Sequence, residues 1–205
     1  MIDVTRTTTR LLEGLHHRTD GTAWEEFDRR YRPILIGFLR SLGASEIDAA
    51  DISQDALVRF LTEYRAGRFD RTRGRLRNWL MSIGRTQMAL ARRREAARRE
   101  QLAETPSLDA IAAETDAGGD DAIWEAQRRR VILREAFDRL KSASASSERT
   151  LEAFERIVFH AESPAQVAEA LSMSMGDVYQ AKSRTTQRLR ALVEEVERAY
   201  DEDSE

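Results

Sequence analysis

The sequence predicts an all-α protein made of two small helical domains. Three prolines in 205 residues leave few helix breaks, and Ala, Leu, Glu and Arg, which are abundant, are good helix formers. Apolar residues also recur at intervals of three and four over long stretches, as they do along one face of a helix. A chain of this length can close one large core or two small ones, so the place of a linker decides between them.

The first domain is expected over residues 1–103. A short helix around His16 is expected to open it, and the later helices each show one apolar face. The three main helices are expected from the Thr22 and Glu25 capping box to Gly43, from about Asp48 to Tyr64, and from about Leu76 to Arg99.

Residues 104–121 are expected to form a flexible acidic linker. They contain Pro106 and the pair Gly118 and Gly119, and they show no sustained helical period. They also carry six acids and no basic residue, whereas residues 59–99 carry thirteen arginines. One stretch therefore attracts polyanions and the next repels them.

The second domain is expected over residues 122–200 and contains a helix-turn-helix. Two helices, at about 122–140 and 149–160, come first. Ser163 and Gln166 then form a capping box around Pro164, and Ser174 starts the last helix after a short turn. Residues 201–205 are expected to be a frayed acidic tail.

The second helix of the first domain carries an acidic stripe. On a helical wheel Asp48, Asp51 and Asp55 lie opposite the apolar face, so they should be exposed and cannot serve to bind DNA. An ordinary solvated face explains the stripe as well as a binding site does. Ile52 favours a protein contact, because it is an apolar residue within the acidic stripe.

The third helix and the loop before it form a basic surface suited to nucleic acid. Asn78, Arg85 and Arg92 lie seven residues apart, opposite the apolar face, and could follow a phosphate backbone. Met81 and Met88 are expected between them as soft apolar contacts. A purely solvated basic surface is the alternative. The arginines that extend the surface from the loop are Arg71, Arg73, Arg75 and Arg77.

The last helix combines a buried stripe with side chains that can read bases. Gln and Arg pair bidentately with adenine and guanine in the major groove, where a helix-turn-helix places the start of its second helix. Any two capped helices joined by a short turn look alike in a single sequence, so other helical pairs remain open. The outward residues are Tyr179, Gln180, Ser183, Arg184 and Gln187, opposite Val178, Ala181, Leu189, Leu192 and Val196.

Nothing in the sequence points to catalysis, a metal or a cofactor. There is no cysteine, so disulfides and thiolate zinc sites are excluded and a reducing interior is expected. His16, His17 and His160 lack a matched nucleophile or acid–base partner and are expected on helix surfaces. No apolar run reaches the roughly 20 residues that cross a bilayer, so a cytoplasmic protein without a membrane span is expected.

Three segments resemble the extracytoplasmic-function sigma factors of the sigma-70 family. Residues 48–60 resemble the family's polymerase-binding helix, and residues 75–85 with 92–94 look like the helix that reads and opens the minus-ten promoter element. Residues 178–184 are similar to the recognition helix of the domain that reads the minus-thirty-five element. Ser172 replaces the usual glycine of the turn, and Thr86 and Leu90 replace the usual Asn and Asp of the minus-ten helix.

The resemblance implies a factor that binds core RNA polymerase, recognises both promoter elements and directs transcription initiation without catalysis of its own. Its partners would be promoter DNA, the β′ clamp helices and the β flap of the polymerase, with an anti-sigma factor as a further partner. The implied polymerase contacts are Asp48, Asp51, Ile52, Gln54 and Asp55. The implied minus-ten contacts are Arg71, Arg75, Asn78, Arg85, Arg92 and Arg93. The implied minus-thirty-five contacts are Tyr179, Gln180, Lys182, Ser183, Arg184 and Gln187.

The resemblance also gives the linker a role. In such factors the connector runs toward the RNA exit path, and acids at 109, 114, 116, 120 and 121 would suit a cationic channel. Two other functions stay open. An autonomous helix-turn-helix regulator would bind duplex DNA without polymerase, and an adaptor would use both charged faces for protein partners.

Overall fold

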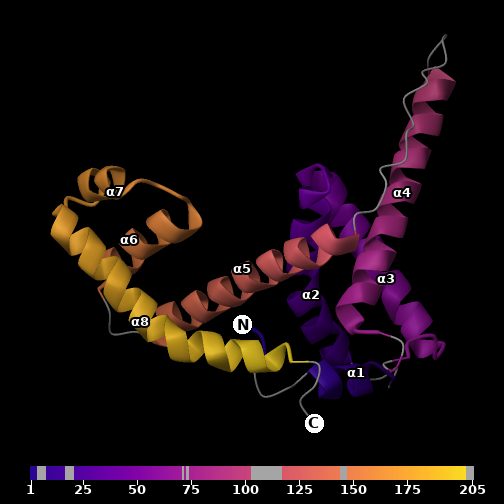
Figure 1. Ribbon diagram of the computed structural model, residues 1–205, viewed down its shortest axis with the longest axis horizontal. Coiled ribbons are helices and arrows are strands. Elements are labelled where there is room, and N and C mark those ends of the chain that lie inside the picture. The colour runs from indigo at the N-terminus through magenta and orange to yellow at the C-terminus, as the bar shows by residue number, and fades with distance from the viewer. Residues whose placement is uncertain are drawn as a thin grey trace. The chain divides into compact units, whose positions relative to one another are not determined.

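The computed structural model describes residues 1–3, 8–16, 21–70, 72, 74–102, 117–143 and 147–201, and this part of the chain is helical without any strand (Figure 1). The all-α prediction is therefore confirmed. None of the helices described is long and apolar enough to cross a membrane. The helices are α1 (Thr8–His16), α2 (Gly21–Ser41), α3 (Glu46–Arg65), α4 (Leu76–Leu102), α5 (Ala117–Ala143), α6 (Glu148–Phe159), α7 (Pro164–Ala170) and α8 (Met175–Ala199).

The chain forms two compact units, one built mainly from residues 6–131 and the other from residues 132–200. The helix α5 contributes its first half to one unit and its second half to the other.

The first unit is a bundle in which α2, α3 and α4 share one core. Phe27 of α2 stacks on Phe60 of α3 with ring centroids 4.6 Å apart, and both rings are fully buried. Gly84 lets α4 approach α2 closely, because a Cβ at this position would lie 3.0 Å from Cδ1 of Leu35. The core thus fixes which faces of α3 and α4 remain at the surface.

Local signals in the sequence set the ends of these helices. Gly43 follows α2 with a φ of 90°, a conformation that glycine adopts without strain. Ser45 then caps α3, and its hydroxyl accepts a hydrogen bond from the backbone N–H of Asp48 at 3.1 Å. The helix therefore begins at Glu46, two residues before the expected start.

The second unit contains the predicted helix-turn-helix pair, α7 and α8. Ser163 and Gln166 form the predicted capping box, with Pro164 at the first helical position, and Ser174 caps α8 through the N–H of Asp177. Ser172, in the turn between the helices, has a φ of 51°. The core of this pair with α6 consists of Ala153, Val167, Ala168, Val178 and Ala181.

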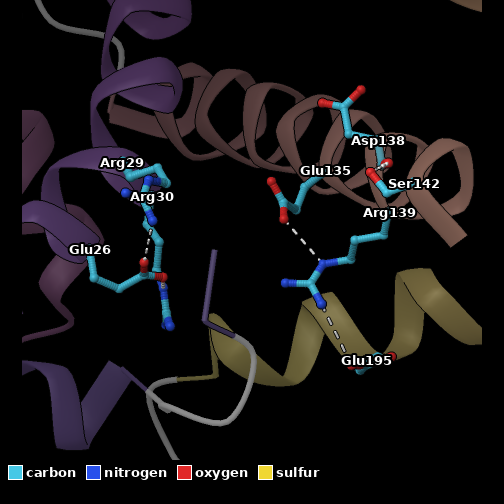
Figure 2. A network of polar contacts seen from close by, with 8 residues as sticks. All are labelled: Glu26, Arg29, Arg30, Glu135, Asp138, Arg139, Ser142 and Glu195. Atoms are coloured by element: carbon cyan, nitrogen blue, oxygen red, sulfur yellow. Dashed lines mark hydrogen bonds and ion pairs between the residues drawn. The ribbon is translucent and has the colours of Figure 1, made fainter. Parts of the chain in front are cut away.

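Charged side chains pair within one helix in the first unit and both within and between helices in the second, as the close-up in Figure 2 shows. In the first unit, Glu26 accepts a hydrogen bond from the fully buried Arg30 at 2.7 Å. In the second, Arg139 of α5 lies 3.1 Å from Glu135 and 3.7 Å from Glu195 of α8. The second pair therefore links the end of α5 to the last helix.

The expected linker ends earlier than its composition indicates. The helix α5 begins at Ala117, so Gly118 and Gly119 are helical and Asp120 lies in its first turn. Glycine costs about 1 kcal/mol in a helix, but Trp124, one turn further on, is buried and anchors the segment. The remaining linker residues, 104–116, lie outside the residues that the structure describes, as do 202–205 of the expected tail.

Candidate nucleic-acid and protein interfaces

The helix α3 presents an exposed polar face. Asp51, Gln54 and Asp55 are exposed as expected, and they lie opposite the buried residues of the helix. Asp48 is exposed too, but its carboxylate accepts a hydrogen bond from the Ser45 hydroxyl at 2.6 Å and so belongs to the helix cap. Asp51, Gln54 and Asp55 are therefore directed to solvent, and their side chains make no hydrogen bond or ion pair with the residues that the structure describes.

The expectation for Ile52 is wrong. This side chain is 7 % exposed and belongs to the core, because the position lies at the edge of the apolar face rather than within the acidic stripe. Two other aliphatic residues, Ile47 at 77 % and Val58 at 53 % exposure, take its place at the surface. Ile47, Asp51, Gln54 and Val58 are spaced by four, three and four residues, so they share one helix face. That spacing was available in the sequence as a signal.

The helix α4 exposes part of the predicted basic surface. Arg75, just before the helix, and Asn78 and Arg93, along it, are exposed. The loop residues Arg71 and Arg73 lie outside the described residues.

Arg92 is exposed as expected and Arg85 is partly buried, but neither side chain projects freely. Arg85 donates two hydrogen bonds to the carboxylate of Asp120 in α5, one of them at 2.5 Å. Arg92 donates from Nη2 to the carbonyl of Leu42 at 3.0 Å. Both guanidinium groups therefore have protein partners in this conformation, which the spacing of seven residues alone could not reveal.

Met81 and Met88 are buried and do not contribute to the DNA surface, which corrects their expected role. They lie on the side of α4 that packs into the bundle, with 6 % and 4 % exposure. The exposed stripe instead contains small side chains, two of them hydroxyl-bearing, that the spacing of seven residues did not single out. They are Ser82, Thr86 and Ala89, between Asn78 and Arg93.

The helix α8 presents every residue assigned to base reading. Tyr179, Gln180, Lys182, Ser183, Arg184 and Gln187 are all exposed. Tyr179, Lys182, Ser183 and Gln187 also line a shallow hollow, together with Thr186 and Arg190.

The opposite face of α8 is buried as predicted at Val178, Ala181, Leu189 and Val196. Thr185 is buried as well and was missed, while Leu192 is partly exposed. The buried face of α8 is therefore apolar apart from the Thr185 hydroxyl, and its packing leaves the polar face exposed to solvent.

In the residues that the structure describes, no cluster of His, Asp and Glu is arranged to hold a metal ion. His16 and His160 are exposed as expected, and His17 lies outside the described residues. The exposed faces of α3, α4 and α8 are thus candidate surfaces for macromolecules, two of them basic or hydrogen-bonding and one acidic and aliphatic.

Comparison with known proteins identifies the domain that carries two of these faces. Residues 27–98, about a third of the chain, match the family described as sigma-70 region 2. The match begins in α2, includes the whole of α3 and covers most of α4. A search of curated proteins finds no match. This part of the chain is therefore similar to region 2 of the sigma-70 factors.

Proposed function

We propose that this protein is an extracytoplasmic-function type sigma factor that binds core RNA polymerase, recognises both promoter elements and directs transcription initiation. The observation that carries the proposal is the outward face of α3 within the matched region 2 domain. It combines the exposed acids Asp51 and Asp55 with the exposed aliphatic residues Ile47 and Val58.

This face has the chemistry of a protein contact rather than a solvated surface. Exposed aliphatic side chains supply apolar area, and acids beside them would select a basic partner. The β′ clamp helices of the polymerase are the proposed partner. DNA is disfavoured here, because the two carboxylates would repel its phosphates.

Promoter DNA is assigned to the other two faces. The α4 surface around Arg75, Asn78 and Arg93 would meet the minus-ten element, with phosphate contacts from the arginines. The outward face of α8 would read the minus-thirty-five element through Gln180 and Arg184. The second unit would also contact the β flap, and an anti-sigma factor would compete for these surfaces.

Directed transcription with purified components tests the proposal. Core RNA polymerase, the purified chain and a library of genomic fragments should give transcripts with defined starts, which core polymerase without the chain does not produce. A variant in which the two acids of α3 are reversed, Asp51→Lys with Asp55→Lys, should bind core polymerase weakly and give few transcripts. Tight binding of the chain to duplex DNA, with no complex with core polymerase, would instead identify an autonomous regulator.

A further inference from the structure

The first half of α5 packs against the side of the first unit where Arg77 and Arg85 of α4 lie. Trp124 is 1 % exposed and packs edge-on against Phe38 of α2, with ring centroids 6.0 Å apart. Gln127 donates a hydrogen bond to Ser41 at 3.3 Å. This half of α5 belongs to the same compact unit as α2 and α4, so the contact is part of that unit.

Two carboxylates of this half of α5 accept hydrogen bonds from two arginines of α4. Asp120 accepts two hydrogen bonds from Arg85, and Glu125 accepts one from Arg77 at 2.7 Å. A carboxylate and a phosphate bind a guanidinium group in the same bidentate manner. The acids therefore stand where phosphates would stand if α4 bound nucleic acid through these two arginines.

The contact is also imperfect, as expected of a segment that can be released. Nε of Arg77 and Oδ1 of Asp121 are 3.6 Å apart, and both atoms are buried without a hydrogen-bond partner among the residues that the structure describes. Such unsatisfied groups make the covered state less favourable. In addition, Gly118 and Gly119 weaken the first turn of the helix that carries Asp120.

We infer that residues 117–131 are a releasable acidic cover of the nucleic-acid face of α4. In the covered state Arg77 and Arg85 are held by carboxylates, and the face binds nucleic acid weakly. Release of the cover frees both guanidinium groups for phosphates. The inference rests on the proposed function, because it assigns a regulation to the promoter-binding face.

Charge neutralisation tests competition between carboxylate and phosphate. Asp120→Asn with Glu125→Gln should bind a mixed-sequence, 30-nucleotide single-stranded DNA on the order of tenfold more tightly at 0.1 M salt, since two phosphate contacts are gained. The slope of log affinity against log salt should steepen by about 1.4, or about 0.7 per contact. The matched control neutralises two exposed acids of α1 and α2, Glu13→Gln with Glu25→Gln, and should leave the slope unchanged.

A reversible disulfide tests whether the cover moves. A Cβ at Gly37 would lie 3.0 Å from Cγ of Gln127, which is close to the spacing from a Cβ to the far sulfur of a disulfide. The chain has no other cysteine, so Gly37→Cys with Gln127→Cys can form a single defined bridge. The oxidised variant should bind the single-stranded DNA at least tenfold more weakly than the same protein after reduction, while both forms remain helical by circular dichroism.

The two variants together decide the inference. Equal DNA affinity of the oxidised and reduced forms overturns it, and so does a neutralised variant whose salt slope matches its control. Initiation by the wild-type chain with core polymerase is measured separately. A chain that initiates normally but shows no effect of the bridge would retain the proposed function and lose the cover.

Discussion

The guanidinium group of Arg92 in α4 donates a hydrogen bond to the carbonyl oxygen of Leu42, which lies just beyond the end of α2. A cation at this place satisfies a carbonyl at the C-terminal end of the helix and interacts favourably with its dipole. Arg92 and the next residue, Arg93, are both exposed, but Arg93 has no side-chain hydrogen bond or ion pair among the described residues. Arg92 therefore helps to hold α4 against the end of α2, whereas Arg93 is available to a partner.

The pair allows a matched comparison of stability and DNA binding. Arg92→Ala should lower the free energy of unfolding by about 1 kcal/mol, because it removes a hydrogen bond from a charged donor. Arg93→Ala should leave stability within about 0.5 kcal/mol and should reduce the salt slope of polymerase–promoter binding by about 0.7–0.9. Urea unfolding and salt-dependent binding measure the two effects. Identical behaviour of the variants would mean that the exposed stripe of α4 is assigned wrongly.

Reversal of the charges on α3 should separate polymerase binding from folding. Asp51→Lys with Asp55→Lys should weaken binding to core polymerase and leave the helical content unchanged, because both side chains are exposed. Competition with labelled wild-type chain measures the affinity. The control is the same reversal at Glu13 and Glu25, exposed acids of α1 and α2. Unchanged affinity in the first variant would exclude this contact.

Gln180 and Arg184 should determine sequence preference at the upstream promoter element. Replacement of either by Ala should cost about 1–3 kcal/mol on the preferred sequence, because a lost bidentate pair removes discrimination at one or two bases. Binding to core polymerase should survive. Selection from randomised upstream sequences measures the preference. Wild-type preferences at every position in both variants would show that α8 does not read bases.

Stability should depend on pH through Glu155 of α6, which lies 2.9 Å from Arg134 and 3.0 Å from Lys141 of α5. Burial alone raises the pKa of this carboxyl, but hydrogen bonds and charges of Lys141 and Arg134 outweigh it, and the pKa lies below the ordinary 4.5. The ionised form is therefore favoured in the folded state. This contribution is present above pH 4.5 and is lost as the pH falls through the lowered pKa.

The variant Glu155→Gln isolates this effect. It should be less stable than wild type at pH 7, by about 0.5–1 kcal/mol for a partly exposed ion pair. The difference should shrink below pH 4.5, where the wild-type carboxyl also becomes neutral. Chemical unfolding across this pH range measures both, and a difference that stays constant with pH would contradict the assignment.

The turn before α8 should tolerate glycine better than serine. Ser172 has a φ of 51°, which strains a residue with a Cβ, and glycine adopts it freely. Ser172→Gly should therefore raise the free energy of unfolding by up to about 1 kcal/mol. Ser174→Ala, in the same turn, should lower it by about 1 kcal/mol because it removes the cap of α8. Thermal unfolding compares the two variants, and a loss of stability in Ser172→Gly would contradict the strain.

The sequence by itself determined the helical class, the starts of α7 and α8, and the outward face of α8. These features depend on local rules: the spacing of apolar residues and the hydrogen bonds of Ser163 and Ser174 to nearby N–H groups. Neither rule depends on where the rest of the chain lies. Resemblance over α3 and α4 pointed to a sigma-70 region 2 domain, because the motifs of such a domain are short and contiguous.

Tertiary structure decided which outward positions are free. Ile52 lies at the edge of the apolar face of α3, and packing against the bundle buries it while Ile47 stays in solvent. Arg85 and Asp120 are 35 residues apart, so no helical period relates them. Burial and long-range ion pairs depend on which helices meet, and that information is spread over the whole chain rather than held in any one segment.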